Sequence, residues 1–139
     1  MEIKALLEAT QTIAVIGLSS DVSRPSHHVA DYLMRVGYRV VPVHPSAQEV
    51  LGKRVYPTLL DIPATVVVDL VVVFRRKEFV VPHAHEAIQR RVHGLWLQDG
   101  VVNEEAALLA HTAGLRVVMD DCILRRHRQL LGFHRGSRE

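Results

Sequence analysis

The sequence predicts an α/β protein built on a parallel sheet. Short runs rich in Val, Ile and Leu alternate with segments of helical periodicity, at a spacing of roughly 20 to 30 residues. The runs contain few polar residues, which is typical of strands covered by helices on both faces. The first run, 12–17, ends in a glycine and leads through a polar loop into an amphipathic helix. A parallel sheet flanked by helices accounts for all three observations.

Composition indicates one globular domain. The chain has 139 residues, of which 48% are hydrophobic and 23% charged, and a chain of this size can bury a core of its own. We therefore expect a single domain over residues 1–139. The longest apolar stretch, 66–74, contains Asp69 and is far shorter than the roughly 20 residues that cross a bilayer, so we expect a cytoplasmic protein without membrane contact. One cysteine, Cys122, excludes an intramolecular disulfide.

Five apolar runs are the predicted strands of the sheet. They cover residues 12–17, 38–43, 69–74, 94–98 and 115–120. Trp96 lies inside the fourth run and is expected in the core. A further, short edge strand near 54–56 would be limited by Pro57, because proline cannot donate a ladder hydrogen bond.

Helical periodicity and end signals place the helices between these strands. The first, 25–36, has Pro25 in its opening turn and is followed by Gly37, which favours helix termination. Asn103 is a good N-cap for another, 103–113. The remaining predicted helices cover 58–62, 77–91 and 124–131.

Chain topology then predicts where a ligand binds. Crossovers between parallel strands are right-handed, which gives the strand order 3-2-1-4-5-6 of a Rossmann-like domain when the edge strand is counted. In such sheets ligands bind in the crevice beyond the carboxyl ends of the strands. The informative segments therefore follow the strands, and they are 17–20, 44–46, 74–76, 98–100 and 120–122.

The loop after the first strand has the features of a phosphate site. Gly17 lets the backbone approach a ligand closely, and the amides of 18–20 lie before a helix N-terminus. Arg24 offers a guanidinium suited to phosphate. An ordinary strand-to-helix turn explains the same residues equally well. The dinucleotide pattern G-x-G-x-x-G is absent, since Ser19 and Val22 stand where glycines are needed.

The end of the second strand also disfavours NAD. An NAD site places an acidic residue there to hold the ribose, whereas this chain reads His44-Pro45 and has no acid before Glu49. An NAD(P)-binding domain is therefore the second candidate. No metal site is expected, because His83 and His85 lie two apart on a helix and point to different faces.

A third candidate function rests on the basic C-terminal segment, which holds Arg125, Arg126, Arg128, Arg135 and Arg138. Such a segment could contact nucleic acid or protein, but cations are also favoured at a helix C-terminus. The chain has no array of aromatic residues for stacking on RNA bases, so we expect no nucleic-acid partner. Cys122 follows two acidic residues and has no evident activator, and no catalytic residue is predicted.

Together the strand-end motifs resemble one family, the small single-domain CoA-binding proteins, which are similar to the N-terminal domain of the succinyl-CoA synthetase alpha subunit. The resemblance covers about residues 12–131. The segments that carry it are Val-Ile-Gly-Leu-Ser at 15–19, Arg-Pro-Ser at 24–26, 37–45, Asp-Leu-Val-Val-Val-Phe-Arg-Arg at 69–76, Trp-Leu-Gln-Asp-Gly-Val at 96–101 and Met-Asp-Asp-Cys at 119–122.

The resemblance implies a site for coenzyme A or an acyl-CoA along the carboxyl edge of the sheet. The family usually has Asn in place of His44 and commonly Leu in place of Asp99. The phosphohistidine and the nucleotide-activating part of the synthetases lie outside the region of resemblance, which favours a binding module without catalytic machinery. The resemblance is compatible with a protein partner and with assembly into a homo-oligomer. The implied ligand residues are Gly17, Leu18, Ser19, Ser20, Arg24, Pro25 and Ser26 for the phosphates, His44 and Pro45 for the nucleotide, Phe74 and Arg75 beside it, and Gln98, Asp99 and Gly100 at the pantetheine end.

Overall fold

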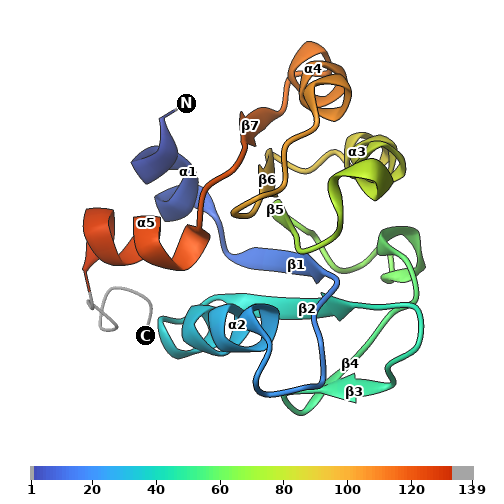
Figure 1. Ribbon diagram of the computed structural model, residues 1–139, viewed down its shortest axis with the longest axis vertical. Coiled ribbons are helices and arrows are strands. Elements are labelled where there is room, and N and C mark those ends of the chain that lie inside the picture. The colour runs from blue at the N-terminus through green and yellow to red at the C-terminus, as the bar shows by residue number, and fades with distance from the viewer. Residues whose placement is uncertain (1, 133–139) are drawn as a thin grey trace.

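A five-stranded parallel sheet forms the centre of the protein (Figure 1). The computed structural model describes residues 2–132. The strand order is β2-β1-β5-β6-β7, which is the predicted order without the edge strand. The strands are β1 (Thr12–Ile16), β2 (Arg39–Val43), β5 (Leu70–Val73), β6 (Gly94–Leu97) and β7 (Arg116–Val118).

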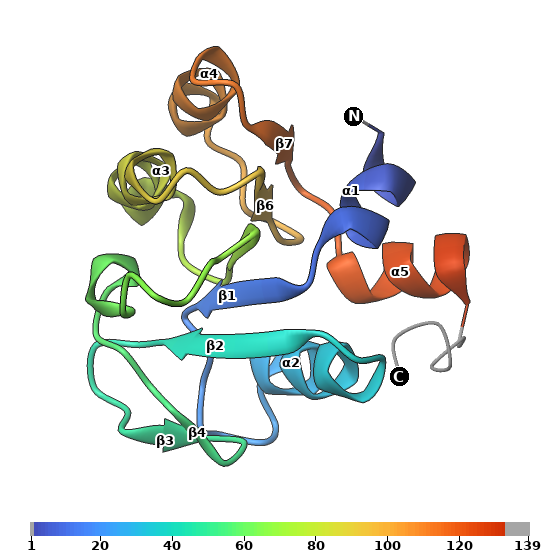
Figure 2. The same ribbon diagram turned by 180° about the vertical axis from the view of Figure 1, so that it is seen from behind.

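Helices cover both faces of this sheet, as Figures 1 and 2 show from opposite sides. One layer holds α1 (Ile3–Ala9), α2 (Pro25–Arg35) and α5 (Ile123–Leu131). The other holds α3 (Val80–Gln89), α4 (Glu104–Thr112) and the 3₁₀ helix Leu59–Asp61. A 3₁₀ turn, Lys77–Phe79, precedes α3, so that Pro82 falls in the first α-helical turn, where its missing N–H costs little. The α/β Rossmann-like fold is confirmed.

Alternation along the strands explains why both faces are apolar. On β1, Ile13 and Val15 pack with the α1–α2–α5 layer, while Ala14 and Ile16 pack with the α3–α4 layer. All residues of β1 and β5 are buried, which is the pattern of a strand inside a two-sided core. Trp96 is fully buried, as expected.

Helix α1 is absent from the sequence-based prediction. It has seven residues, and its side chains Leu6 and Leu7 are buried in the core. The hydroxyl of Tyr38 donates a hydrogen bond to the carbonyl of Leu7 (2.7 Å), which ties this short helix to the start of β2. An isolated helix of this length is unstable in water, so tertiary packing rather than propensity holds α1 in place.

Helix α5, which carries part of the basic C-terminal segment, buries one of its faces in the core. Ile123, Leu124 and His127 are buried on its inner face. The Nδ1 of His127 lies 2.7 Å from the hydroxyl of Tyr32, and burial raises the pKa of that Tyr32 hydroxyl. The arginines 125, 126 and 128 occupy the less buried positions of the helix. The predicted basic residues Arg135 and Arg138 lie outside the described residues.

The β2 edge of the sheet is closed by a single bridge rather than by a full strand. Tyr56 donates its N–H to the carbonyl of Pro42 (3.1 Å) and accepts the N–H of His44 (3.0 Å). Residues before it form an antiparallel pair, β3 (Glu49–Val50) with β4 (Lys53–Arg54). The expected edge strand near 54–56 is thus reduced to the bridge between Val43 and Tyr56, since Pro57 prevents its continuation.

The opposite edge, β7, has only three residues and is covered by one of its own side chains. The Arg116 N–H donates to the carbonyl of His93 (2.9 Å), toward β6. Because successive residues of a strand alternate in direction, the carbonyl of Val117 faces away from the sheet. Nη1 of Arg116 donates a hydrogen bond to that carbonyl (2.7 Å).

Candidate functional site

A glycine turn at the end of β1 brings three strand ends together. Gly17 has φ +86°, and a Cβ at this position would lie 2.4 Å from the carbonyl oxygen of Phe74. Its N–H donates to the carbonyl of Val43 (2.8 Å), while the Phe74 N–H donates to the carbonyl of Ile16 (2.8 Å). Only glycine permits this φ together with so close a backbone approach.

Hydrogen bonds within the following loop set its shape. The Ser19 N–H donates to Oγ of buried Ser26 (3.0 Å), and Oγ of Ser19 accepts the N–H of Asp21 (3.0 Å). The Leu18 side chain is buried in the core. Within residues 2–132 the backbone N–H groups of Leu18 and Ser20 donate no hydrogen bond, but only Ser20 is exposed and can offer its N–H to an external acceptor. Ligand contact by the fully buried Leu18 stays a prediction.

One acidic side chain, Asp21, and one basic side chain, Arg24, lie close together in this loop. Hydrogen bonds from the Ser23 side chain and backbone lower the pKa of Asp21. These bonds keep the carboxylate occupied, because its Oδ1 accepts both the N–H and the hydroxyl of Ser23. Arg24 lies with Nε 4.0 Å from Oδ2 of Asp21, at the limit of an ion pair, and its side chain is 70% exposed. The Arg24 guanidinium is thus available to an anion in the groove described next.

Two adjoining hollows, of about 300 and 460 Å³, form one groove beyond the carboxyl ends of β1, β2 and β5. Both are lined by Gly17, Arg24, His44 and Phe74. We call this space the carboxyl-edge groove. The smaller hollow is also lined by Ser19, Pro25 and Ser26, and the larger by Pro45, Arg75, Arg76 and Phe79.

His44 has a defined role within the groove. Its Nδ1 accepts the backbone N–H of Ser46 (3.1 Å) and lies 3.2 Å from the Ser46 hydroxyl. Because a backbone N–H can only donate, Nδ1 is an acceptor and the proton of the neutral ring is on Nε2. His44 can therefore present an N–H donor to a ligand, as the side-chain amide of Asn would.

Arg75 is fixed at the rim of the groove by two neighbours. Its guanidinium lies over the ring of Phe79, 4.9 Å from the centroid. Its Nη1 lies 3.4 Å from Nε2 of His83 on α3. Arg76 lies in the strand-end segment 74–76 that the sequence pointed to, although it was not among the implied ligand residues, and Phe79 was not predicted at all.

The predicted pantetheine-end residues, Gln98, Asp99 and Gly100, do not line the groove. Gln98, which directly follows β6, is buried, and its Oε1 accepts the N–H of Ile123 (2.9 Å). This contact caps the N-terminus of α5. The Gly100 N–H donates to Oδ1 of Asp120 (2.8 Å). Ligand contact by Gln98, Asp99 and Gly100 stays a prediction.

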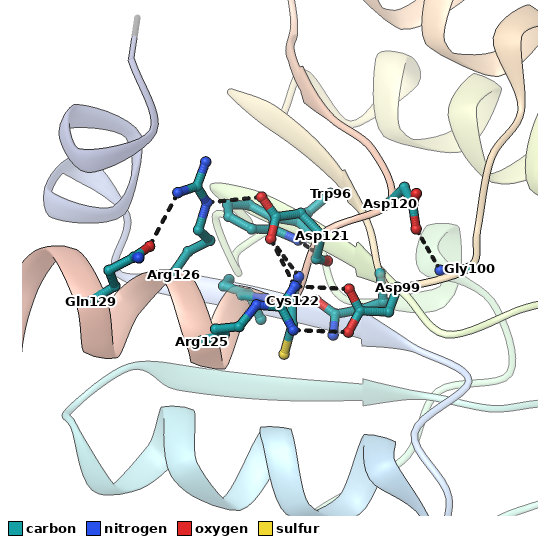
Figure 3. A network of polar contacts seen from close by, with 11 residues as sticks. Trp96, Asp99, Gly100, Asp120, Asp121, Cys122, Arg125, Arg126 and Gln129 are labelled. Carbon is teal, nitrogen blue, oxygen red and sulfur yellow. Dashed lines mark hydrogen bonds and ion pairs between the residues drawn. The ribbon is translucent and has the colours of Figure 1, made fainter.

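An ion-pair network links Asp99 to the first turn of α5 (Figure 3). Arg125 donates to both oxygens of Asp99, at 3.0 and 3.1 Å, and also to Asp121 (3.1 Å). The Arg125 guanidinium lowers the pKa of Asp99, and Asp99 in turn raises the pKa of Arg125. Arg126 donates to the other oxygen of Asp121 (2.8 Å). Cys122 stands within this network as the half-buried residue before α5.

Another hollow, of about 1000 Å³, lies at the amino-terminal ends of β6 and β7, beside Arg91, His93, His111 and Arg116. No predicted site residue lines it, and it is remote from the strand ends where ligands bind in this fold. We therefore place the candidate site at the smaller carboxyl-edge groove.

In residues 2–132 no group of three potential metal ligands is found. No helix of that part of the chain combines the length and apolarity needed to cross a membrane.

Fold and groove define a small Rossmann-like domain with a cation-lined crevice at the carboxyl edge of its sheet. The chain belongs to the CoA binding domain family, which matches residues 11–128. This confirms the family resemblance of the strand-end motifs.

Relatives of similar and of greater length share this domain. YneT of Bacillus subtilis is 38% identical over 122 residues, covering 88% of this chain and 89% of YneT. A hypothetical protein of Pyrococcus horikoshii with a solved structure has 35% identity and a TM-score of 0.90, over 94% of this chain and 90% of that one. The alpha subunit of ADP-forming acetate–CoA ligase II of Pyrococcus furiosus is 30% identical, over 80% of this chain but 26% of the subunit.

Proposed function

We propose that this protein binds coenzyme A or an acyl-CoA in the carboxyl-edge groove. The observation that carries the proposal is the convergence of Gly17, Arg24, His44 and Arg75 on one groove in a chain of the CoA binding domain family. A CoA molecule carries a pyrophosphate and a 3′-phosphate, and the groove offers three guanidinium groups, those of Arg24, Arg75 and Arg76, that suit such anions.

Each part of the groove matches a part of the ligand. Arg24 and Arg75, with the N–H of exposed Ser20 next to the groove residue Ser19, are proposed to bind the pyrophosphate. His44 donates from Nε2 to the nucleotide. The apolar rings of Phe74 and Phe79 and the ring of Pro45 provide surface for the adenine and the upper pantetheine arm.

NAD is a poorer match to the same groove. The chain supplies no carboxylate directly after β2 to hold ribose hydroxyls, since the next acid, Glu49, belongs to the β3–β4 hairpin. The proposal concerns binding alone.

Calorimetric titration with CoA, dephospho-CoA and NAD tests the proposal. We expect CoA to bind most tightly, dephospho-CoA more weakly because it lacks the 3′-phosphate, and NAD weakest. Saturation at about 100 times Kd should also stabilise the fold by about 2.7 kcal/mol, seen as a higher melting temperature.

Matched variants locate the site. Arg24→Ala removes a groove cation and should weaken CoA binding about 10-fold or more, whereas Arg35→Ala removes an exposed cation at the far end of α2 and should not. Equal affinity for NAD and CoA, or equal effects of the two variants, would refute the proposal.

A further inference from the structure

The side chain of Arg75 is supported by two residues of α3, His83 and Glu86. His83 lies on the second turn of α3, and its ring stands between Arg75 and Glu86. Nδ1 of His83 is 2.9 Å from Oε1 of Glu86, and Nε2 is 3.4 Å from Nη1 of Arg75. The side chains of His83 and Glu86 are only 13% and 19% exposed. Neither of them lines the carboxyl-edge groove.

Hydrogen-bond chemistry fixes the direction of this chain of contacts. A guanidinium can only donate, so Nε2 of His83 must accept from Arg75. The ring proton then stands on Nδ1 and is donated to the carboxylate of Glu86. Glu86 thus selects the one ring tautomer that accepts from Arg75, in the way that a carboxylate behind a metal-bound histidine fixes that ring.

The consequence for Arg75 is a restricted position. Phe79 holds the face of the guanidinium and His83 holds one nitrogen at its edge, which leaves its other N–H groups for an anion. A flexible arginine loses side-chain entropy on binding, and a pre-positioned one loses less.

We propose that His83 and Glu86 are positioning residues that hold Arg75 for the phosphates of the ligand without touching the ligand themselves. This inference rests on the proposed function, because it takes the groove as the CoA site.

The tautomer of His83 can be measured without any ligand. In ¹⁵N-labelled protein, long-range proton–nitrogen correlation spectra distinguish the two nitrogens of each neutral ring. We expect His83 to carry its proton on Nδ1, and Glu86→Leu to abolish this preference. A neutral ring protonated on Nε2 in the wild-type protein would overturn the inference, whatever the outcome of ligand titrations.

Affinity for CoA then tests the role of the contact. Arg75→Ala should weaken CoA binding about 10- to 100-fold, and His83→Leu about 3- to 10-fold, because the first removes a charge and the second only its support. His83→Gln should stay within about twofold of wild type, since its amide oxygen can still accept from Arg75. His85→Gln, on the exposed side of α3, is the matched control and should have no effect.

A double-mutant cycle separates positioning from general damage. In the Arg75→Ala background, His83→Leu should cause no further loss of affinity. Pantetheine, which lacks phosphate, should bind all variants equally. A full additional loss in the double variant, or an equal loss for pantetheine, would overturn the inference. If wild-type protein binds no CoA, the proposed function fails, and the spectrum of His83 alone then decides whether the Glu86–His83–Arg75 contacts exist.

Discussion

The backbone approach at Gly17 makes Gly17→Ala the most demanding test of the fold around the groove. An alanine would have to adopt φ +86°, which costs about 1–2 kcal/mol for an L-residue. Its Cβ would also stand 2.4 Å from the carbonyl oxygen of Phe74, a backbone atom that cannot rotate away. Moving β1 and β5 apart to relieve this overlap should cost a further 1–3 kcal/mol or so. We expect the free energy of unfolding to fall by about 2–5 kcal/mol in total.

Urea denaturation followed by circular dichroism measures this loss, with an unchanged slope showing that both proteins unfold in the same way. Gly114→Ala is the matched control, because Gly114 has a similar φ of +93° but no atom within 4 Å of the point where a Cβ would stand, and we expect about 1–2 kcal/mol there. The difference between the variants isolates the close approach. Equal losses for the two, or a loss below about 1 kcal/mol for Gly17→Ala, would refute the reasoning.

Three further changes test contacts around the carboxyl edge. Gln98→Leu removes the buried acceptor of the Ile123 N–H and should lower the free energy of unfolding by about 1–3 kcal/mol, measured by urea denaturation; no loss would contradict capping of α5. Asp99→Asn breaks the ion pair with Arg125, which is 57% exposed on both sides, so its effect should be small. Because Arg125 lowers the pKa of Asp99 below its ordinary value of 3.8, this contribution is present above that pH and is lost as the pH falls through the lower folded-state value. The difference between wild type and Asp99→Asn should therefore be largest near neutrality and vanish in acid, and a constant difference in denaturation across pH would contradict it. Ser26→Ala removes the acceptor of the Ser19 N–H in the loop after β1 and, if the groove binds CoA as proposed, should weaken that binding in calorimetry; unchanged affinity would show that the loop holds its shape without this contact.

Periodicity in the sequence was sufficient for the main architecture. Near-continuous apolar runs of this length, separated by helical segments, favour strands covered on both sides. Right-handed crossovers and the doubly wound plan then predict the order β2-β1-β5-β6-β7 that the structure shows. The groove followed from the same reasoning, since Gly17, His44 and Phe74 each stand directly after a strand.

Elements stabilised by distant contacts were the ones that local patterns did not predict. Helix α1 depends on burial of Leu6 and Leu7 beneath the sheet, and its seven residues carry too short a pattern to be read alone. The cap of α5 comes from Gln98, 25 positions before the amide that it accepts. His127 stands among the arginines of α5 and was not singled out from the sequence, yet its ring contacts Tyr32, 95 positions away. Such pairings are set by tertiary packing, which no short window of sequence contains.

At both edge strands of the sheet, some outward-facing backbone groups are already hydrogen-bonded within the protein. On β2 the outward carbonyl of Pro42 and the N–H of His44 are already occupied by Tyr56, and Pro42 itself has no N–H to offer. On β7 the guanidinium of Arg116 occupies the outward carbonyl of Val117 and brings a positive charge to the flank. Charged side chains and proline at such positions discourage edge-to-edge aggregation. These contacts disfavour the addition of a strand at either edge and favour docking of a neighbouring domain on the helices and loops, where the mouth of the groove lies.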